Sequence, residues 1–220
     1  MNYMGFSQIY DSIPYILYGI WVTLQFVSVS AVFGFIWGII LALFKISRVT
    51  FLTGFADAYT FIFRGVPLIL QLAIIYFATP QVVGYDITAF QAGVLAFSLH
   101  SGAYISEIIR AGILAVDKGQ TEAAQALGVS YRPMMKDIIL PQAMKNILPA
   151  LMNEFITLTK ESAIVSTIGV LDIMRRAQIV AADKFLYFPP LITAAVIYLI
   201  LVTILTLLGR AVERRMRRSD

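Results

Sequence analysis

Two long uncharged segments constrain the fold of this chain more than any other feature. No Asp, Glu, Lys or Arg occurs from Ser12 to Phe44, or between Lys184 and Arg210. A membrane-spanning helix needs about 20 predominantly apolar residues. Hydrophobic residues make up 59% of the chain and charged residues 14%, whereas soluble domains are about 45–50% apolar and about 25% charged. The sequence therefore predicts an all-α, polytopic membrane protein.

The charged residues divide the chain into five predicted spans. We place them at about 15–44, 55–79, 88–114, 146–169 and 185–209, in one transmembrane domain over residues 1–220. With the N-terminus outside, eleven lysines and arginines lie on the cytoplasmic side, in 45–54, 115–145 and the tail, and three lie outside. The positive-inside rule favours this orientation. We expect a multi-pass membrane protein with a cytoplasmic C-terminus.

The composition also excludes several classes of site. The chain has no cysteine, one histidine (His100) and no G-x-x-x-x-G-K-[ST] loop for nucleotide phosphates. We therefore expect no catalytic residue, no metal and no cofactor in this chain. The basic residues do not cluster on an aromatic-interleaved soluble module, so nucleic acid is not an expected partner.

Two spacings predict contacts of the spans. Gly34 and Gly38 form a G-x-x-x-G, which lets helix backbones approach closely. Glu107 and Arg110 lie three residues apart and can form an ion pair on one helix face. We interpret both features as structural, with a role in transport as the alternative for the ion pair.

A polar segment from Thr121 to Pro141, TEAAQALGVSYRPMMKDIILP, separates the third and fourth spans. Its alanine-rich first part favours a short helix. We expect Thr121 to cap the N-terminus of this helix and Gly128 to supply the left-handed residue after it. The sequence thus predicts an ordered helix-turn-helix connection.

The residues of this segment resemble the EAA loop of permeases in binding-protein-dependent ABC importers. Glu-Ala-Ala, then Gly, Ile and Leu-Pro occur at the spacing of that motif. The alternative is an alanine-rich surface helix that contains a glycine by chance. The resemblance implies a type I ABC importer permease fold and a cytoplasmic helix that couples to an ATPase through Glu122, Ala123, Ala124, Gly128, Leu140 and Pro141.

Arg64-Gly65-x-Pro67, followed by Gln71, resembles the second-helix signature of polar amino acid permeases. These are the histidine, arginine, lysine and glutamine uptake systems. Pro67 predicts a kink or break within the second span, and we assign Arg64, Pro67 and Gln71 a structural or pathway role. The alternative for Arg64 is an arginine that snorkels at a helix end.

The resemblance also implies partners. It predicts a second permease subunit, in a homo- or heterodimer, two ATP-binding subunits that bind ATP and Mg²⁺, and an extracytoplasmic substrate-binding protein. It also implies a location in the bacterial cytoplasmic (inner) membrane, where lipid surrounds the spans, and an amino acid as substrate. A membrane receptor that senses solutes with the same fold is the alternative from another functional class.

The fourth predicted span carries Glu154, Lys160 and Glu161, which must face protein or a water-filled cavity. On a continuous helix the two glutamates fall within about 20° of each other, whereas Lys160 points away. Ser162 and Gly169 predict local unwinding after them. The alternative interpretation is a salt-bridged structural trio.

The resemblance places an amino acid site at this segment, through Glu154, Lys160, Glu161 and Ser162. Lys160 and backbone amides suit a carboxylate, and Glu161 suits an ammonium group. Glu154 suits a side-chain cation. The sequence therefore predicts a basic substrate such as arginine, lysine or histidine, with glutamine or polar amino acids in general as the alternative.

Overall fold

The computed structural model describes residues 5–217, and these residues contain helices and no strand. The helices are α1 (Phe6–Ile9), α2 (Ile13–Leu17), α3 (Gly19–Ile46), α4 (Thr50–Gly65), α5 (Leu68–Val83), α6 (Ala89–Leu114), α7 (Lys118–Ala126), α8 (Tyr131–Pro133), α9 (Leu140–Glu161), α10 (Ile173–Lys184) and α11 (Phe188–Arg217). Short 3-10 segments, η1 (Tyr10–Ser12) and η3 (Ser162–Ile168), and a π-helical segment, η2 (Met134–Ile139), connect some of them.

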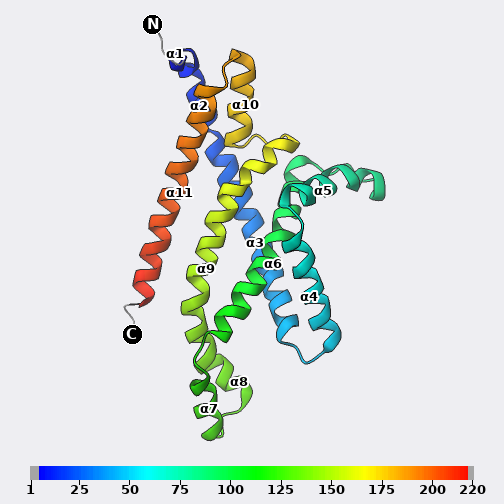
Figure 1. Ribbon diagram of the computed structural model, residues 1–220, viewed down its shortest axis with the longest axis vertical. Coiled ribbons are helices and arrows are strands. Elements are labelled where there is room, and N and C mark those ends of the chain that lie inside the picture. Colours follow the sequence, from blue (N-terminus) through cyan, green and yellow to red (C-terminus); the bar gives the residue numbers. More distant parts are fainter. Residues whose placement is uncertain (1–4, 218–220) are drawn as a thin grey trace.

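The long helices form an elongated bundle in which α6 is central. Helix α6 packs against α3 and α9, and α9 packs in turn against α11. Figure 1 shows α7 and α8 at one end of the bundle and α1, α2 and α10 at the other. The C-terminal end of α11 and the connection from α3 to α4 point toward the α7–α8 end (Figure 1). The three basic segments of the sequence thus lie toward the same end.

Three of the described helical segments are long and apolar enough to cross a membrane, namely Phe6–Ile46, Ala89–Leu114 and Phe188–Arg215. Helices α4 and α5 reach this criterion only as a pair, and they are bent by 100° at the break between them. Helix α9 is not among these segments, since it carries the ionisable residues discussed above. The helical fold is confirmed, and the number of five spans stays a prediction.

The helices do not begin and end where the predicted spans do. Helical structure begins at Phe6, before residue 15. Within 55–79, α4 ends at Gly65 and α5 begins after Pro67. Pro80 lies inside α5, and Gly84 follows this helix with a left-handed φ of 71°. The predicted break at Pro67 is confirmed.

The glycine pair in α3 permits the close approach of α3 and α6. A Cβ atom at Gly34 would lie 2.0 Å from Ser101 Oγ, and one at Gly38 would lie 2.6 Å from Ile105 Cγ2. Ser101 is completely buried and Ile105 is 3% exposed, so neither side chain has free space into which it could move. The packing role predicted from the glycine spacing is confirmed.

This packing predicts that Gly38→Leu destabilises the protein by about 1–3 kcal/mol, the usual cost of overpacking a core. Gly54→Leu in α4 is the matched control, because a Cβ there meets nothing within 4 Å. The measurement is the thermal unfolding midpoint of each purified variant in detergent. Equal destabilisation by the two substitutions would contradict the close-packing interpretation.

A buried carboxyl group, Asp172, holds α10 against α11 at the opposite end of the bundle from α7. Its side chain is 0% exposed and accepts hydrogen bonds from the backbone N–H of Arg175, at 2.8 Å, and from the hydroxyl of Tyr198, at 2.9 Å. Burial raises the pKa of Asp172 to about 6 from an ordinary value of 3.8. The folded protein therefore binds this proton more tightly than the unfolded chain does.

Because the pKa is raised on folding, Asp172 stabilises the fold fully at low pH and loses this contribution as pH rises from about 4 to about 6. The expected loss is about 2–3 kcal/mol. Asp172→Asn keeps a capping side chain but does not titrate. Thermal unfolding of wild type and variant between pH 4.5 and 7 should show a steeper decline for wild type, and parallel profiles would exclude this effect.

Candidate functional site

The segment after α6 is an ordered helix-turn-helix, as predicted, although its cap is not Thr121. Helix α7 begins one residue after Asp117, whose side chain accepts a hydrogen bond from the backbone N–H of Gly119 at 2.7 Å. Thr121 lies within the helix, so the predicted cap was wrong. Gly128 has a φ of 74°, and hydrogen bonds from Gly128 N to Gln125 O and from Val129 N to Ala124 O complete a Schellman motif.

The predicted coupling residues of α7 divide between a small core and the surface. Ala124 is 3% exposed and packs with the buried Met134 and Ile139 of η2. Glu122, Ala123 and Gly128 are exposed. Ala124 therefore packs α7 onto η2 through its methyl group, and its role in coupling stays a prediction.

The last two predicted coupling residues, Leu140 and Pro141, begin α9. Pro141 stands in the first turn of α9, which continues directly from the π-helical segment η2, so its missing N–H falls at the junction of the two. Leu140 is 39% exposed. The coupling segment and α9 are therefore joined without a flexible loop.

The break between α4 and α5 is held by Gln71. Its Nε2 donates to the carbonyl oxygens of Phe63 and Val66, both at 2.8 Å, and lies 3.2 Å from His100 Nδ1. These carbonyls lie beside the bend at Pro67 and need such a partner. The guanidinium of Arg64 lies 5.2 Å from the ring centre of Tyr104.

His100, which the sequence analysis left without a role, is 7% exposed and lies against this bend. Its position as a single histidine inside an apolar helix indicated that His100 is buried and hydrogen-bonded, because a buried imidazole needs a polar partner. That partner could not be identified from sequence.

Glu154 lies on α9 and points into a cavity of about 110 Å³ between α3, α6 and α9. The other lining residues are apolar, namely Ala31, Phe35, Ile105, Leu151, Phe155 and Leu158. Glu154 makes no hydrogen bond or ion pair with any residue that the structure describes. An ionised carboxylate in such surroundings requires a cation or water.

The other predicted substrate residues follow at the end of α9. The helix is continuous through Glu154 and Glu161 and changes to the 3-10 segment η3 at Ser162. The helix geometry therefore changes where the sequence predicted, but the backbone becomes more tightly wound and does not unwind. Lys160 is exposed. Ser162 is fully buried and donates to the carbonyl of Thr159 at 2.8 Å, so its hydroxyl faces the protein interior.

The described part of the chain contains no salt bridge among Glu154, Lys160 and Glu161, so the salt-bridged trio does not form. By contrast, the predicted ion pair of Glu107 and Arg110 is present, with an N–O distance of 2.8 Å. Glu107 also pairs with Lys45 of α3. Sequence analysis missed Lys45 because the two residues are 62 positions apart.

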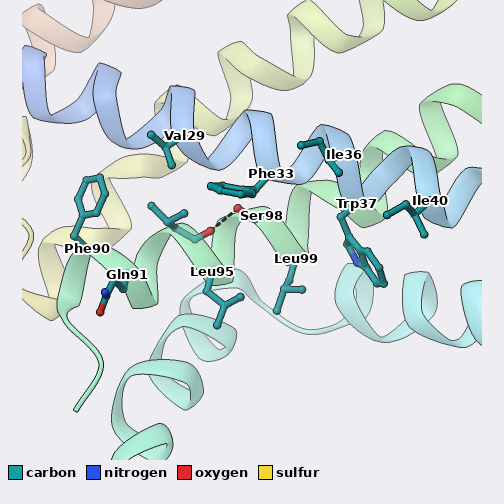
Figure 2. A pocket seen from close by; sticks show the side chains of 11 residues that line it. Val29, Phe33, Ile36, Trp37, Ile40, Phe90, Gln91, Leu95, Ser98 and Leu99 are labelled. Carbon is teal, nitrogen blue, oxygen red and sulfur yellow. Dashed lines mark hydrogen bonds between the residues drawn. The ribbon is translucent and has the colours of Figure 1, made fainter. Parts of the chain in front are cut away.

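A second cavity, of about 480 Å³, is an apolar groove along α3 and α6 (Figure 2). Phe33, Leu95 and Leu99 are among its lining side chains, and the hydroxyl of Ser98 donates to the carbonyl of Val94 at 2.6 Å. No charged residue lines this groove. It cannot compensate for the lost hydration of a charged solute, so we do not assign the transport site to it.

Comparisons with known proteins agree with the geometry. The family described as "Binding-protein-dependent transport system inner membrane component" matches residues 34–218. The chain is 56% identical over 217 residues to the "Arginine transport system permease protein ArtQ" of Bacillus subtilis, with 99% of each chain covered. It is 52% identical to the "Putative glutamine transport system permease protein GlnP" of Rickettsia bellii, covering 93% of this chain and 94% of the relative.

A solved structure, "Crystal structure of an amino acid ABC transporter with histidines", superposes with a TM-score of 0.93 at 43% identity, covering 96% of this chain and 98% of the other. The chain therefore has the type I ABC permease fold. The family match over most of its length and the 56% identical relative show that the chain belongs to the inner membrane components of binding-protein-dependent transport systems.

Proposed function

We propose that this chain is the transmembrane subunit of an ATP-driven importer for amino acids, and that it prefers basic ones. Its relatives include an arginine permease and putative glutamine permeases. In this proposal the chain crosses the bacterial cytoplasmic membrane five times, with α9 and η3 as the fourth span. The N-terminus is outside, and the α7–α8 end and the C-terminus face the cytoplasm.

The observation that carries the basic preference is the unpaired carboxylate of Glu154. A side-chain guanidinium or ammonium entering the apolar cavity would supply the cation that this carboxylate lacks within the chain. A neutral amide would leave the negative charge uncompensated. The chemistry of the cavity therefore favours arginine or lysine over glutamine.

The cavity holds only part of such a substrate. Its volume of about 110 Å³ is below the roughly 300–1,000 Å³ of typical ligand pockets. It accommodates the end of a side chain, while the α-amino and α-carboxyl groups lie toward Glu161 and Lys160 at the end of α9. Ser162 supports this region by fixing the start of η3, and in this conformation its hydroxyl does not face the substrate.

ATP binding and hydrolysis belong to a separate ATPase in this proposal. Glu122, Ala123 and Gly128 form the exposed surface that docks on it, and Ala124 holds that surface in place from below. A dimer of permeases, two ATPase subunits and an extracytoplasmic binding protein complete the transporter. The chain itself is a transport subunit and not an enzyme.

The test is uptake of labelled arginine by proteoliposomes that contain the permease, its ATPase and its binding protein. We expect ATP-dependent uptake that unlabelled arginine and lysine suppress more strongly than glutamine does. Equal competition by glutamine would contradict the basic preference. A ligand-induced change of ATPase rate without uptake would replace the importer by a solute sensor.

A further inference from the structure

A third cavity, with charged walls, lies between α3, α4 and α6, on residues that the Glu154 cavity does not use. Asp57, Thr60 and Arg64 are spaced i, i+3 and i+7 on α4 and therefore share one face of that helix. Such a polar face in a membrane helix must contact protein or water. Opposite it stand Tyr104 and Glu107 of α6.

These side chains line a cavity of about 460 Å³ together with Lys45 of α3. Its size lies within the range of ligand sites. Lys45 Nζ donates to Thr60 Oγ1 at 2.8 Å, pairs with Glu107 and lies 3.3 Å from Asp57 Oδ1. The Lys45 side chain is only 4% exposed, so the wall is built from ordered contacts between three helices.

Arg64 is the exception among these charges. In the part of the chain that the structure describes, its guanidinium forms no hydrogen bond and no ion pair, and it lies over the ring face of Tyr104. A guanidinium offers five N–H donors in a planar arrangement that matches a carboxylate. The cavity therefore has an unused anion-binding group at one end.

The other end of the cavity offers an acceptor. The Asp57 side chain is 63% exposed and shares one oxygen with Lys45, which leaves further acceptor sites on the carboxylate. Seven residues separate it from Arg64, about 10 Å along the helix. An extended basic amino acid carries its α-carboxylate and its side-chain cation well apart, as this arrangement requires.

We propose that this cavity is a second binding station for a basic amino acid, with the α-carboxylate on Arg64 and the side-chain cation at Asp57. The station extends from the α4–α5 bend, where Arg64 and Gly65 end α4, toward Lys45 in the last turn of α3. That end of α3 leads toward the α7–α8 end of the bundle (Figure 1). Tyr104 and Glu107 of the station flank Ile105 of the Glu154 cavity on α6, so the two cavities lie at a similar depth on different faces of this helix. This inference rests on the proposed import function.

The experiment measures equilibrium binding of labelled arginine to the purified permease–ATPase complex without binding protein. All variants carry Glu154→Gln, so that arginine binding at the Glu154 cavity is weakened. Arg64→Gln should lower affinity for arginine by about tenfold or more. It should leave affinity unchanged for agmatine, which lacks the carboxylate. Arg48→Gln is the matched control, because Arg48 is an exposed arginine near the same end of α3 and does not line the cavity.

A second arm tests the other end of the station and does not depend on how Arg64 variants fold. Asp57→Asn should weaken binding of arginine but not of citrulline, its uncharged analogue. The proposal is overturned if arginine and agmatine respond equally to Arg64→Gln, if arginine and citrulline respond equally to Asp57→Asn, or if Glu154→Gln removes all saturable binding. A wild-type complex that transports no amino acid would instead refute the import function itself.

Discussion

Gly128→Asp should abolish ATP-driven uptake while leaving the permease in the membrane. Gly128 is exposed, and a Cβ atom there would meet nothing within 4 Å, so the substitution causes no clash within the chain. Its φ of 74° is a conformation that Asp tolerates better than most residues, at a cost of about 1–2 kcal/mol or less. The main effect is therefore a new carboxylate on the proposed docking surface. Uptake in proteoliposomes should fall at least tenfold. This corresponds to a loss of about 1.4 kcal/mol or more in the free energy of coupling.

Gly84→Asp is the matched control for this substitution. Gly84 has a φ of 71°, and its Cβ position is equally open, but it ends α5, far from α7. It should retain most of the uptake activity. If both variants lose uptake to the same extent, backbone strain explains the loss. If Gly128→Asp transports normally, the coupling role of the α7 surface is wrong.

Glu154→Gln should reduce uptake of arginine and lysine by roughly 10- to 100-fold. The variant loses one charge-assisted hydrogen bond to the substrate cation, which contributes about 1.5–3 kcal/mol. The variant keeps the size of the side chain and removes its charge. Uptake of glutamine should change much less, since no cation then needs the carboxylate. The measurement is the ratio of arginine to glutamine uptake at matched protein levels.

Asp183→Asn controls for the loss of a carboxylate as such. Asp183 lies on α10, its side chain is 67% exposed, and it pairs with Lys184. This variant should leave the uptake ratio unchanged. A uniform loss for all three substrates in Glu154→Gln would show that Glu154 does not recognise the substrate cation.

Local signals explain most of what the sequence predicted. The uncharged runs identified the first and last long helices, and Pro67 identified the break between α4 and α5. The Thr121 cap failed for a local reason as well. Asp117 is also a favoured capping residue, and it begins α7 one turn earlier. Helical periodicity alone cannot choose between two suitable caps.

Contacts between distant segments were beyond the sequence. The burial of Ala124 depends on Met134 and Ile139 folding back against it. The pairing of Lys45 with Glu107 depends on how α3 crosses α6. The sequence did indicate that Glu154 faces the protein, because a carboxylate in a membrane helix is costly elsewhere, but the cavity around it is formed by helices distant in sequence.

The continuity of α9 has a mechanical consequence. The helix starts at Leu140, directly after the segment that packs against α7, and continues past Pro149 to Glu154, about 21 Å farther along its axis. Pro149 removes one intrahelical hydrogen bond and favours a kink, so the part of α9 that carries Glu154 can tilt relative to the first turn. In the proposed importer, a displacement of the first turn by the ATPase would therefore reach the Glu154 cavity through this single helix.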